Sequence, residues 1–125
     1  LLPGVSSISD AITHSCCLTA MDLGASAILA ATKTGYTAKV ISRFRPGCPI
    51  IAVCQSEKTR RQLAISWGVH PLLTGEVDST DRLFSMTVDV ARKEGVVQPG
   101  ETVVITAGVP IGKSGTTNLI KAQVV

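Results

Sequence analysis

The chain has 125 residues, of which 45% are hydrophobic and only 3% aromatic, so it is long enough for one domain with an aliphatic core. Charged residues make up 17% and the mean hydropathy is +0.34, which excludes a disordered chain. No uncharged apolar run reaches the ~18 residues that a membrane span requires. We therefore expect a soluble single domain over residues 1–125 with no membrane partner.

The formal net charge of +3 is unevenly distributed along the chain. Between residues 33 and 61, seven basic side chains accompany one acid, Glu57, which gives a local charge of +6. The other residues hold five basic and eight acidic side chains, a net of −3. This division predicts an anionic partner. Because Tyr36 and Phe44 are the only aromatic residues of the basic segment, we do not expect that partner to be a nucleic acid.

The sequence does not begin with Met and carries no signal-peptide or transit pattern, so we expect it to be cut from a longer, cytoplasmic polypeptide. Its four cysteines have no Cys-x-x-Cys spacing. The absence of this spacing predicts free thiols in a reducing compartment and no zinc site.

Short apolar runs alternate with amphipathic stretches, which is typical of an α/β domain. In chain order the patterns predict a helix at Ser9–Leu23, a strand at Ala27–Ala31, a helix at Gly35–Phe44, a strand at Pro49–Cys54, a helix from Ser56 to about Trp67, a strand at Val69–Leu73, a helix from Ser79 or Thr80 to Gly95, and strands at Thr102–Ala107 and Leu119–Val125. Pro71 cannot donate a ladder hydrogen bond, so the strand that contains it belongs at an edge of the sheet.

The last connection, residues 108–118, has no helical pattern and is too short for a helical crossover, so the fifth strand should run antiparallel to the fourth. Right-handed crossovers then give a three-layer αβα sandwich whose five-stranded mixed sheet has the order 3-2-1-4-5. In that order the winding reverses between strands one and four, which is where open α/β sheets bind ligands.

Two loops at the ends of those two strands repeat one pattern, Lys33-Thr34-Gly35-Tyr36-Thr37 and Lys113-Ser114-Gly115-Thr116-Thr117. Glycine lets backbone amides turn toward a ligand, hydroxyls donate to phosphate oxygens, and lysine supplies positive charge. The first loop also begins a helix, whose free amides favour an anion. The pattern predicts a phosphate site, although ordinary helix capping would also place Ser, Thr and Gly at these positions.

The other motifs in the sequence do not indicate a functional site. Gly112-Lys113-Ser114 is not a Walker motif, because Gly108 precedes Gly112 too closely and a strand follows. His14 and His70 have no partner in the sequence pattern, and nothing indicates nucleophilic or acid–base catalysis. We expect no catalytic residue and no metal ligand.

The run Ala27–Thr37, the segment Arg43–Pro46, the strand Pro49–Val53 and the ending Gly108–Asn118 together resemble the C-terminal domain of pyruvate kinase, bacterial type. The resemblance covers Ser9 to Val125. It implies a regulatory domain without a cofactor of its own. In the parent enzyme a separate β/α barrel, absent here, would transfer a phosphoryl group from phosphoenolpyruvate to ADP with Mg²⁺ and K⁺.

The resemblance also implies an allosteric site for a sugar phosphate or a nucleoside monophosphate. Thr32, Lys33, Thr34, Gly35 and Thr37, with Tyr36 between them, would hold a phosphate, and Gly112 to Thr117 would close over the effector. Arg82 lies near the position of an arginine that contacts the second phosphate of fructose 1,6-bisphosphate. The tryptophan-bearing insertion of eukaryotic members has no counterpart between Leu73 and Leu83, so AMP and ribose 5-phosphate stay open beside the bisphosphate.

Two alternatives are open at this point. A flavodoxin-like module would use Thr32–Thr37 as an FMN phosphate loop, but it needs aromatic residues to enclose the flavin, and only Tyr36 is at hand. An assembly-only domain would pair its last strand or a helix with a second copy. The resemblance implies such contacts between C-terminal domains of a homotetramer, besides those with the remainder of the parent chain.

Overall fold

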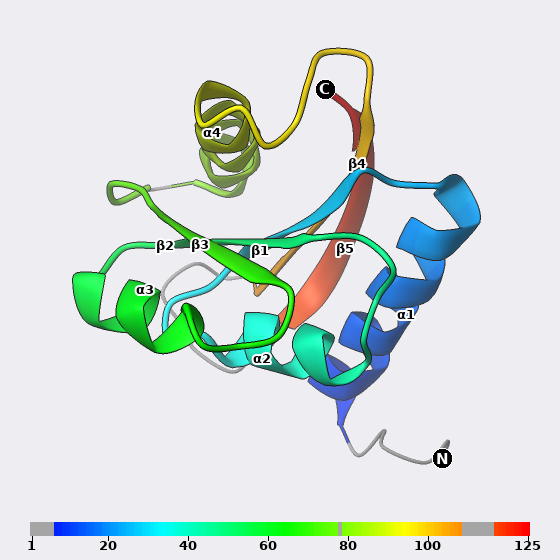
Figure 1. Cartoon of the computed structure of the whole chain (residues 1–125), viewed down its shortest axis with the longest axis horizontal. Coiled ribbons are helices and arrows are strands. Elements are labelled where there is room, and N and C mark those ends of the chain that lie inside the picture. The colour runs from blue at the N-terminus through cyan, green and yellow to red at the C-terminus, as the bar shows by residue number, and fades with distance from the viewer. Residues whose placement is uncertain (1–6, 78, 109–116) are drawn as a thin grey trace.

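Five strands form one sheet in a computed structural model that describes residues 7–77, 79–108 and 117–125 (Figure 1). The strands are β1 (Ala27–Ala31), β2 (Ile50–Cys54), β3 (Val69–Leu73), β4 (Thr102–Gly108) and β5 (Thr117–Val124). Their order is β3-β2-β1-β4-β5, with β5 antiparallel to β4 and all other neighbours parallel. The predicted α/β fold class and strand order are confirmed.

Four helices cover the two faces of this sheet: α1 (Ile8–Leu23), α2 (Tyr36–Arg43), α3 (Glu57–Leu63) and α4 (Thr80–Lys93). Figure 1 places α1, α2 and α3 on one side and α4 on the other. The packing agrees, because side chains of the first three helices share one buried cluster with Ile28 and Ile50, whereas α4 packs on Leu29 and Ile51. The domain is therefore the predicted three-layer sandwich.

The central strands are buried on both faces, as their unbroken aliphatic sequences require. Every residue of β1 and β2 is buried, and Ile28 and Leu29 have no exposed surface. In β3 only Val69 is buried, and Pro71 lies opposite Ala52. Since β3 has a single neighbour in the sheet, the edge position predicted from Pro71 is confirmed.

Serine side chains begin three of the helices. In each case the serine Oγ accepts a hydrogen bond from the backbone N–H of the residue three positions later in the chain, which is ordinary N-capping. The three serines are Ser7, Ser56 and Ser79. α2 differs, because it begins after Gly35 with no side-chain cap. The amino end of α2 is thus shaped by the backbone of the loop that precedes it.

The third helix is shorter than predicted. We expected it to reach about Trp67, but α3 ends at Leu63, and a turn follows in which the N–H of Ser66 donates to the carbonyl of Leu63. Ile65 is 91% exposed, so no packing holds this β-branched residue in a helix. Gly68, at φ = +67°, then reverses the chain into β3.

All four cysteines are free thiols. Cys16 and Cys17 are buried among aliphatic side chains of α1 and the sheet. Burial, as the largest cause, raises the pKa of Cys16 to about 12 and that of Cys17 to about 11, so both stay protonated and unreactive at neutral pH. None of the helices in the described parts of the chain is long and apolar enough to span a membrane.

Candidate functional site

The segment from Thr32 to Thr37, called the loop below, leaves the carboxyl end of β1 and ends with the first two residues of α2, Tyr36 and Thr37. The Oγ1 of Thr32 accepts a hydrogen bond from the N–H of Gly35 at 2.9 Å, and the N–H of Thr32 donates to the carbonyl of Val53 at 3.0 Å. These two bonds close the turn and tie its start to β2. The loop conformation is therefore held by hydrogen bonds within the domain.

Gly35 is required at its position for two reasons. Its φ is +90°, a conformation that residues with a Cβ rarely adopt. A Cβ there would also lie 3.1 Å from Cδ2 of Leu63 in α3. The loop thus lies so close to α3 that a side chain at residue 35 would have to displace Leu63.

The side chains of the loop divide between surface and interior. Lys33 and Thr34 are exposed, whereas Thr37 is buried. Tyr36 is partly exposed, and its hydroxyl lies 3.4 Å from Oδ1 of Asp10 in α1. Lys33 and Thr34 are therefore the loop side chains that a ligand in solution reaches first.

Lys33 and Thr34 form one wall of an open cavity of about 570 Å³. The opposite wall comes from the segments that follow β2 and β3, and the lining residues are Lys33, Thr34, Gln55, Ser56, Thr74, Gly75 and Glu76. The lining combines one cation, one carboxylate, three hydroxyls and an amide. This inventory can bind a small polar molecule that carries an anionic group and several hydroxyl groups.

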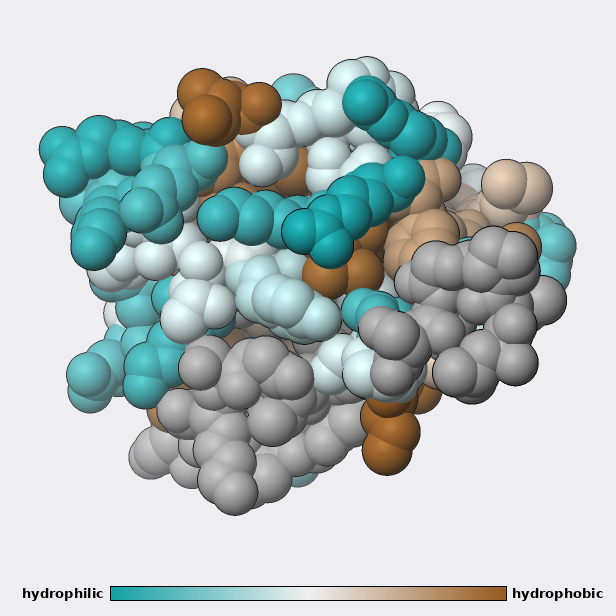
Figure 2. Space-filling view, turned by 90° about the horizontal axis from the view of Figure 1, so that it is seen from below, coloured by the Kyte–Doolittle hydropathy of each residue, from teal (hydrophilic) through white to brown (hydrophobic). Residues whose placement is uncertain are grey.

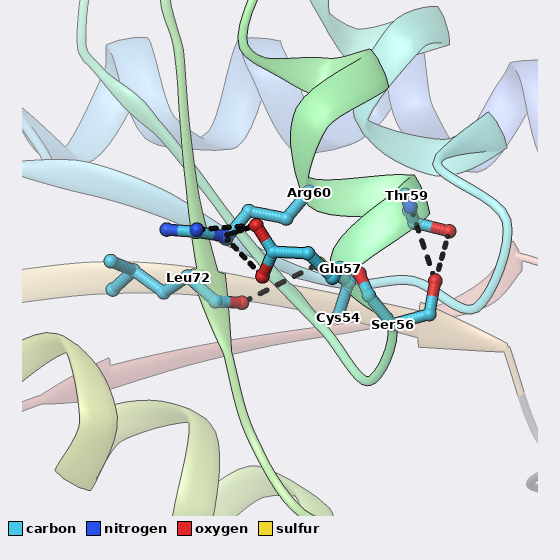
Figure 3. A network of polar contacts seen from close by, with 6 residues as sticks. All are labelled: Cys54, Ser56, Glu57, Thr59, Arg60 and Leu72. Atoms are coloured by element: carbon cyan, nitrogen blue, oxygen red, sulfur yellow. Dashed lines mark hydrogen bonds and ion pairs between the residues drawn. The ribbon is translucent and has the colours of Figure 1, made fainter.

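A chain of hydrogen bonds links the amino end of α3 to this loop, and Figure 3 shows its part between Ser56 and Thr59. The Oγ of Ser56 accepts from the N–H of Thr59 at 3.1 Å and lies 2.9 Å from Oγ1 of Thr59. The Oγ1 of Thr59 in turn donates to the carbonyl oxygen of Lys33 at 3.3 Å. The cavity wall at Ser56 and the loop at Lys33 are consequently joined by one buried hydroxyl.

One arginine of α3 is paired with a neighbouring carboxylate. The guanidinium of Arg60 forms a salt bridge and hydrogen bonds with the carboxylate of Glu57, which lowers the pKa of Glu57 (Figure 3). Both side chains are nearly half exposed, so this pair adds little to stability. Lys33 is the single lysine or arginine among the residues that line the cavity.

A sequence model of the family described as "Pyruvate kinase, alpha/beta domain" matches residues 10–123. The chain belongs to this pyruvate kinase domain family. The match agrees with the resemblance noted in the sequence and favours it over the flavodoxin-like alternative.

Curated relatives carry the name pyruvate kinase. The chain is 54% identical over 117 residues to the enzyme of Clostridium acetobutylicum, 45% identical over 120 residues to that of Lactobacillus delbrueckii subsp. bulgaricus, and 43% identical over 118 residues to that of Geobacillus stearothermophilus. These matches cover 94–96% of this chain but only 20–25% of each relative. The chain corresponds to the C-terminal domain of such enzymes.

The pyruvate kinase domain brings some of the predicted site residues together. Thr32 to Thr37 lie in one loop beside the cavity. Arg82 lies in the first turn of α4, is exposed, and is not among the residues that line the cavity. Thr117 is the first residue of β5 and pairs with Gly108. The remaining predicted residues, Gly112, Lys113, Ser114, Gly115 and Thr116, lie outside the described residues.

Sequence reasoning missed the second wall of the cavity. Gln55 and Ser56 follow β2 and Thr74 follows β3, so parallel strand order brings all three to the edge where β1 ends. The sequence pattern predicts Ser56 only as the beginning of a helix, and its side chain does cap α3. Polar residues directly after consecutive parallel strands were the signal that could have identified this wall.

Proposed function

We propose that this chain is the regulatory domain of a pyruvate kinase and binds a phosphorylated effector at the loop of residues 32–37. The observation that carries the proposal is the position of Lys33 and Thr34, exposed at a polar cavity on a loop that turns at Gly35 into the amino end of α2. Phosphate is bound in proteins by lysine ammonium groups, by hydroxyl donors and by the first backbone amides of a helix.

The effector is a sugar phosphate or a nucleoside monophosphate, with fructose 1,6-bisphosphate, AMP and ribose 5-phosphate as the candidates. Its phosphate docks on residues 32–37, and residues 112–117 with Arg82 complete the site. The hydroxyl, amide and carboxylate groups of Ser56, Gln55 and Glu76 suit the hydroxyl-bearing part of any of these ligands.

Regulation follows if the effector binds one arrangement of the parent enzyme more tightly than another. The parent enzyme then transfers a phosphoryl group from phosphoenolpyruvate to ADP in a separate barrel with Mg²⁺ and K⁺, in the cytoplasm. The domain itself supplies binding and no chemistry, so residues 1–125 alone have no kinase activity.

A second role, in assembly, is supported by apolar side chains on the outer surface. Ile8, Leu18 and Met21 of α1 are 75%, 47% and 69% exposed. β5 lies at the edge of the sheet and packs beside α1. An apolar helix face next to an open strand edge suits contact with a second copy across a twofold axis.

The effector proposal is tested by thermal unfolding with fructose 1,6-bisphosphate, AMP and ribose 5-phosphate. A ligand at 100 times its Kd adds roughly 2.7 kcal/mol to the free energy of unfolding, so at least one of the three should raise Tm. Lys33→Ala should weaken the binding of that ligand about tenfold, because a charged hydrogen bond is lost.

The matched control is Lys93→Ala, at the exposed end of α4 on the opposite face of the sheet, which should bind as the unmodified chain does. Equal affinity of Lys33→Ala and the unmodified chain would show that the phosphate binds elsewhere.

A further inference from the structure

Helix α3 contacts the candidate phosphate loop at two points. The side chain of Leu63 comes within 3.1 Å of where a Cβ of residue 35 would lie, and Thr59 donates to the carbonyl of Lys33. Thr59 is 6% exposed and is not among the residues that line the cavity. It contacts the loop from the inside of the domain, on the side that a ligand does not reach.

The hydroxyl of Thr59 is fully engaged. It lies within hydrogen-bond distance of Oγ of Ser56 and donates its proton to the carbonyl of Lys33, while the backbone N–H of Thr59 bonds to the same Ser56 oxygen. A hydroxyl used in this way has no donor left for a ligand. Thr59 can therefore affect ligand binding only by changing the conformation of the loop to which it is bonded.

The held carbonyl fixes the direction of a neighbouring amide. In a planar trans peptide the C=O and the following N–H point to opposite sides. Since the carbonyl of Lys33 points to Thr59, the N–H of Thr34 points away from α3. The bond from Thr59 therefore sets the orientation of a backbone donor on the segment where the phosphate would dock.

From this geometry we infer that Thr59 is a positioning residue, whose hydroxyl presets residues 33–35 for phosphate binding. The inference rests on the function proposed above, and it assigns to α3 a part in effector binding that the sequence pattern did not indicate. A loop that is already ordered loses less conformational freedom on binding, and that difference appears as affinity.

The variants that test this inference are Thr59→Val, which keeps the shape and removes the hydroxyl, and Thr59→Ser, which restores it. The matched control is Thr87→Val. Thr87 is buried as well, but its hydroxyl bonds to the carbonyl of Leu83 within α4, on the other face of the sheet. Both Val variants remove one buried threonine hydroxyl, so a general loss of stability affects them alike.

Binding of inorganic phosphate and of ribose 5-phosphate is measured by titration calorimetry. We expect Thr59→Val to bind both about tenfold more weakly, Thr59→Ser to bind within about twofold of the unmodified chain, and Thr87→Val to bind normally; tenfold corresponds to about 1.4 kcal/mol. Unchanged binding by Thr59→Val, or failure of Thr59→Ser to restore it, overturns the inference.

Amide hydrogen exchange of the ligand-free chain separates this inference from the proposed function. Thr59→Val should speed exchange at residues 33–36, and Thr87→Val should leave it unchanged. If the unmodified chain binds none of fructose 1,6-bisphosphate, AMP and ribose 5-phosphate, the proposed function is wrong, whereas unchanged exchange in Thr59→Val overturns the positioning role by itself.

Discussion

Gly35 joins the requirements of the fold to those of the candidate site. Its φ of +90° turns the chain from β1 into α2, and Leu63 lies where a side chain would begin. Replacement by any other residue must strain the backbone and displace the side chain of Leu63. The same position therefore controls folding and the shape of the loop at the cavity.

Gly35→Ala should lower the free energy of unfolding by about 2 kcal/mol, because an L-residue at positive φ costs 1–2 kcal/mol and the new methyl group crowds Leu63. Urea unfolding at pH 7 measures this change. Gly47→Ala serves as the control, since Gly47 has no positive φ and a methyl group there would meet no atom within 4 Å beyond its chain neighbours. A loss in Gly35→Ala no larger than in Gly47→Ala contradicts the assignment of strain.

Glu101 is the residue most suited to a test of pH dependence. Its carboxylate accepts hydrogen bonds from the hydroxyl of Ser26 at 2.7 Å and from the N–H of Gln98, and these bonds, that of Ser26 foremost, lower the pKa of Glu101 from 4.5. A lowered pKa in the folded state means that the stabilisation is complete above the unfolded pKa and is lost as the pH falls through the folded pKa.

Glu101→Gln should therefore reduce stability at pH 7 and make the decline between pH 5 and pH 3 shallower than in the unmodified chain. Urea midpoints across this range measure both effects. Glu94→Gln, an exposed substitution at the end of α4, should leave the pH profile unchanged. An identical acid decline in Glu101→Gln and the unmodified chain would mean that the carboxylate stabilises nothing.

At the scale of elements, the sequence predicts what is encoded in one continuous segment. The strands Ala27–Ala31 and Ile50–Cys54 are apolar throughout and are buried throughout. Because strands buried on both faces have unbroken apolar sequences, these two could be assigned from the sequence. The end of α3 was missed because residues 64–67 are compatible with a helix and fail to form one only for lack of packing. Helix ends of this kind depend on tertiary contacts, which a local pattern does not contain.

Only the part of the candidate site that is encoded in one continuous segment could be predicted from the sequence. Lys33, Thr34 and Gly35 form a local pattern that is visible in the sequence. Thr59 and Thr74 belong to the site only because β2 and β3 run parallel to β1 and end at the same edge. Their part becomes apparent once the strand register is known.

At the scale of the whole molecule, two of the basic side chains in the segment of residues 33–61 are engaged in contacts within the domain. Figure 2, which views the side where α2 and α3 lie, shows hydrophilic side chains spread over this face with paler and hydrophobic groups between them. Arg60 pairs with Glu57, and the guanidinium of Arg45 lies 4.6 Å from the centroid of the Trp67 ring. Of the seven basic side chains in this segment, Lys33 is the one that lines the described cavity.

The outer face of α1 gives the assembly proposal its test. If Leu18 and Met21 contact a second copy, Met21→Glu places a carboxylate in an apolar contact and should convert the associated form to monomer. Ile65→Glu is the control, because Ile65 is even more exposed than Met21, at 91% against 69%, but lies after α3 and away from α1. Sedimentation of each chain over a range of concentrations measures the association. An unmodified chain that stays monomeric, or a Met21→Glu variant that still associates, would remove α1 from the contact, whereas loss of association in Ile65→Glu as well would place the contact surface elsewhere on the domain.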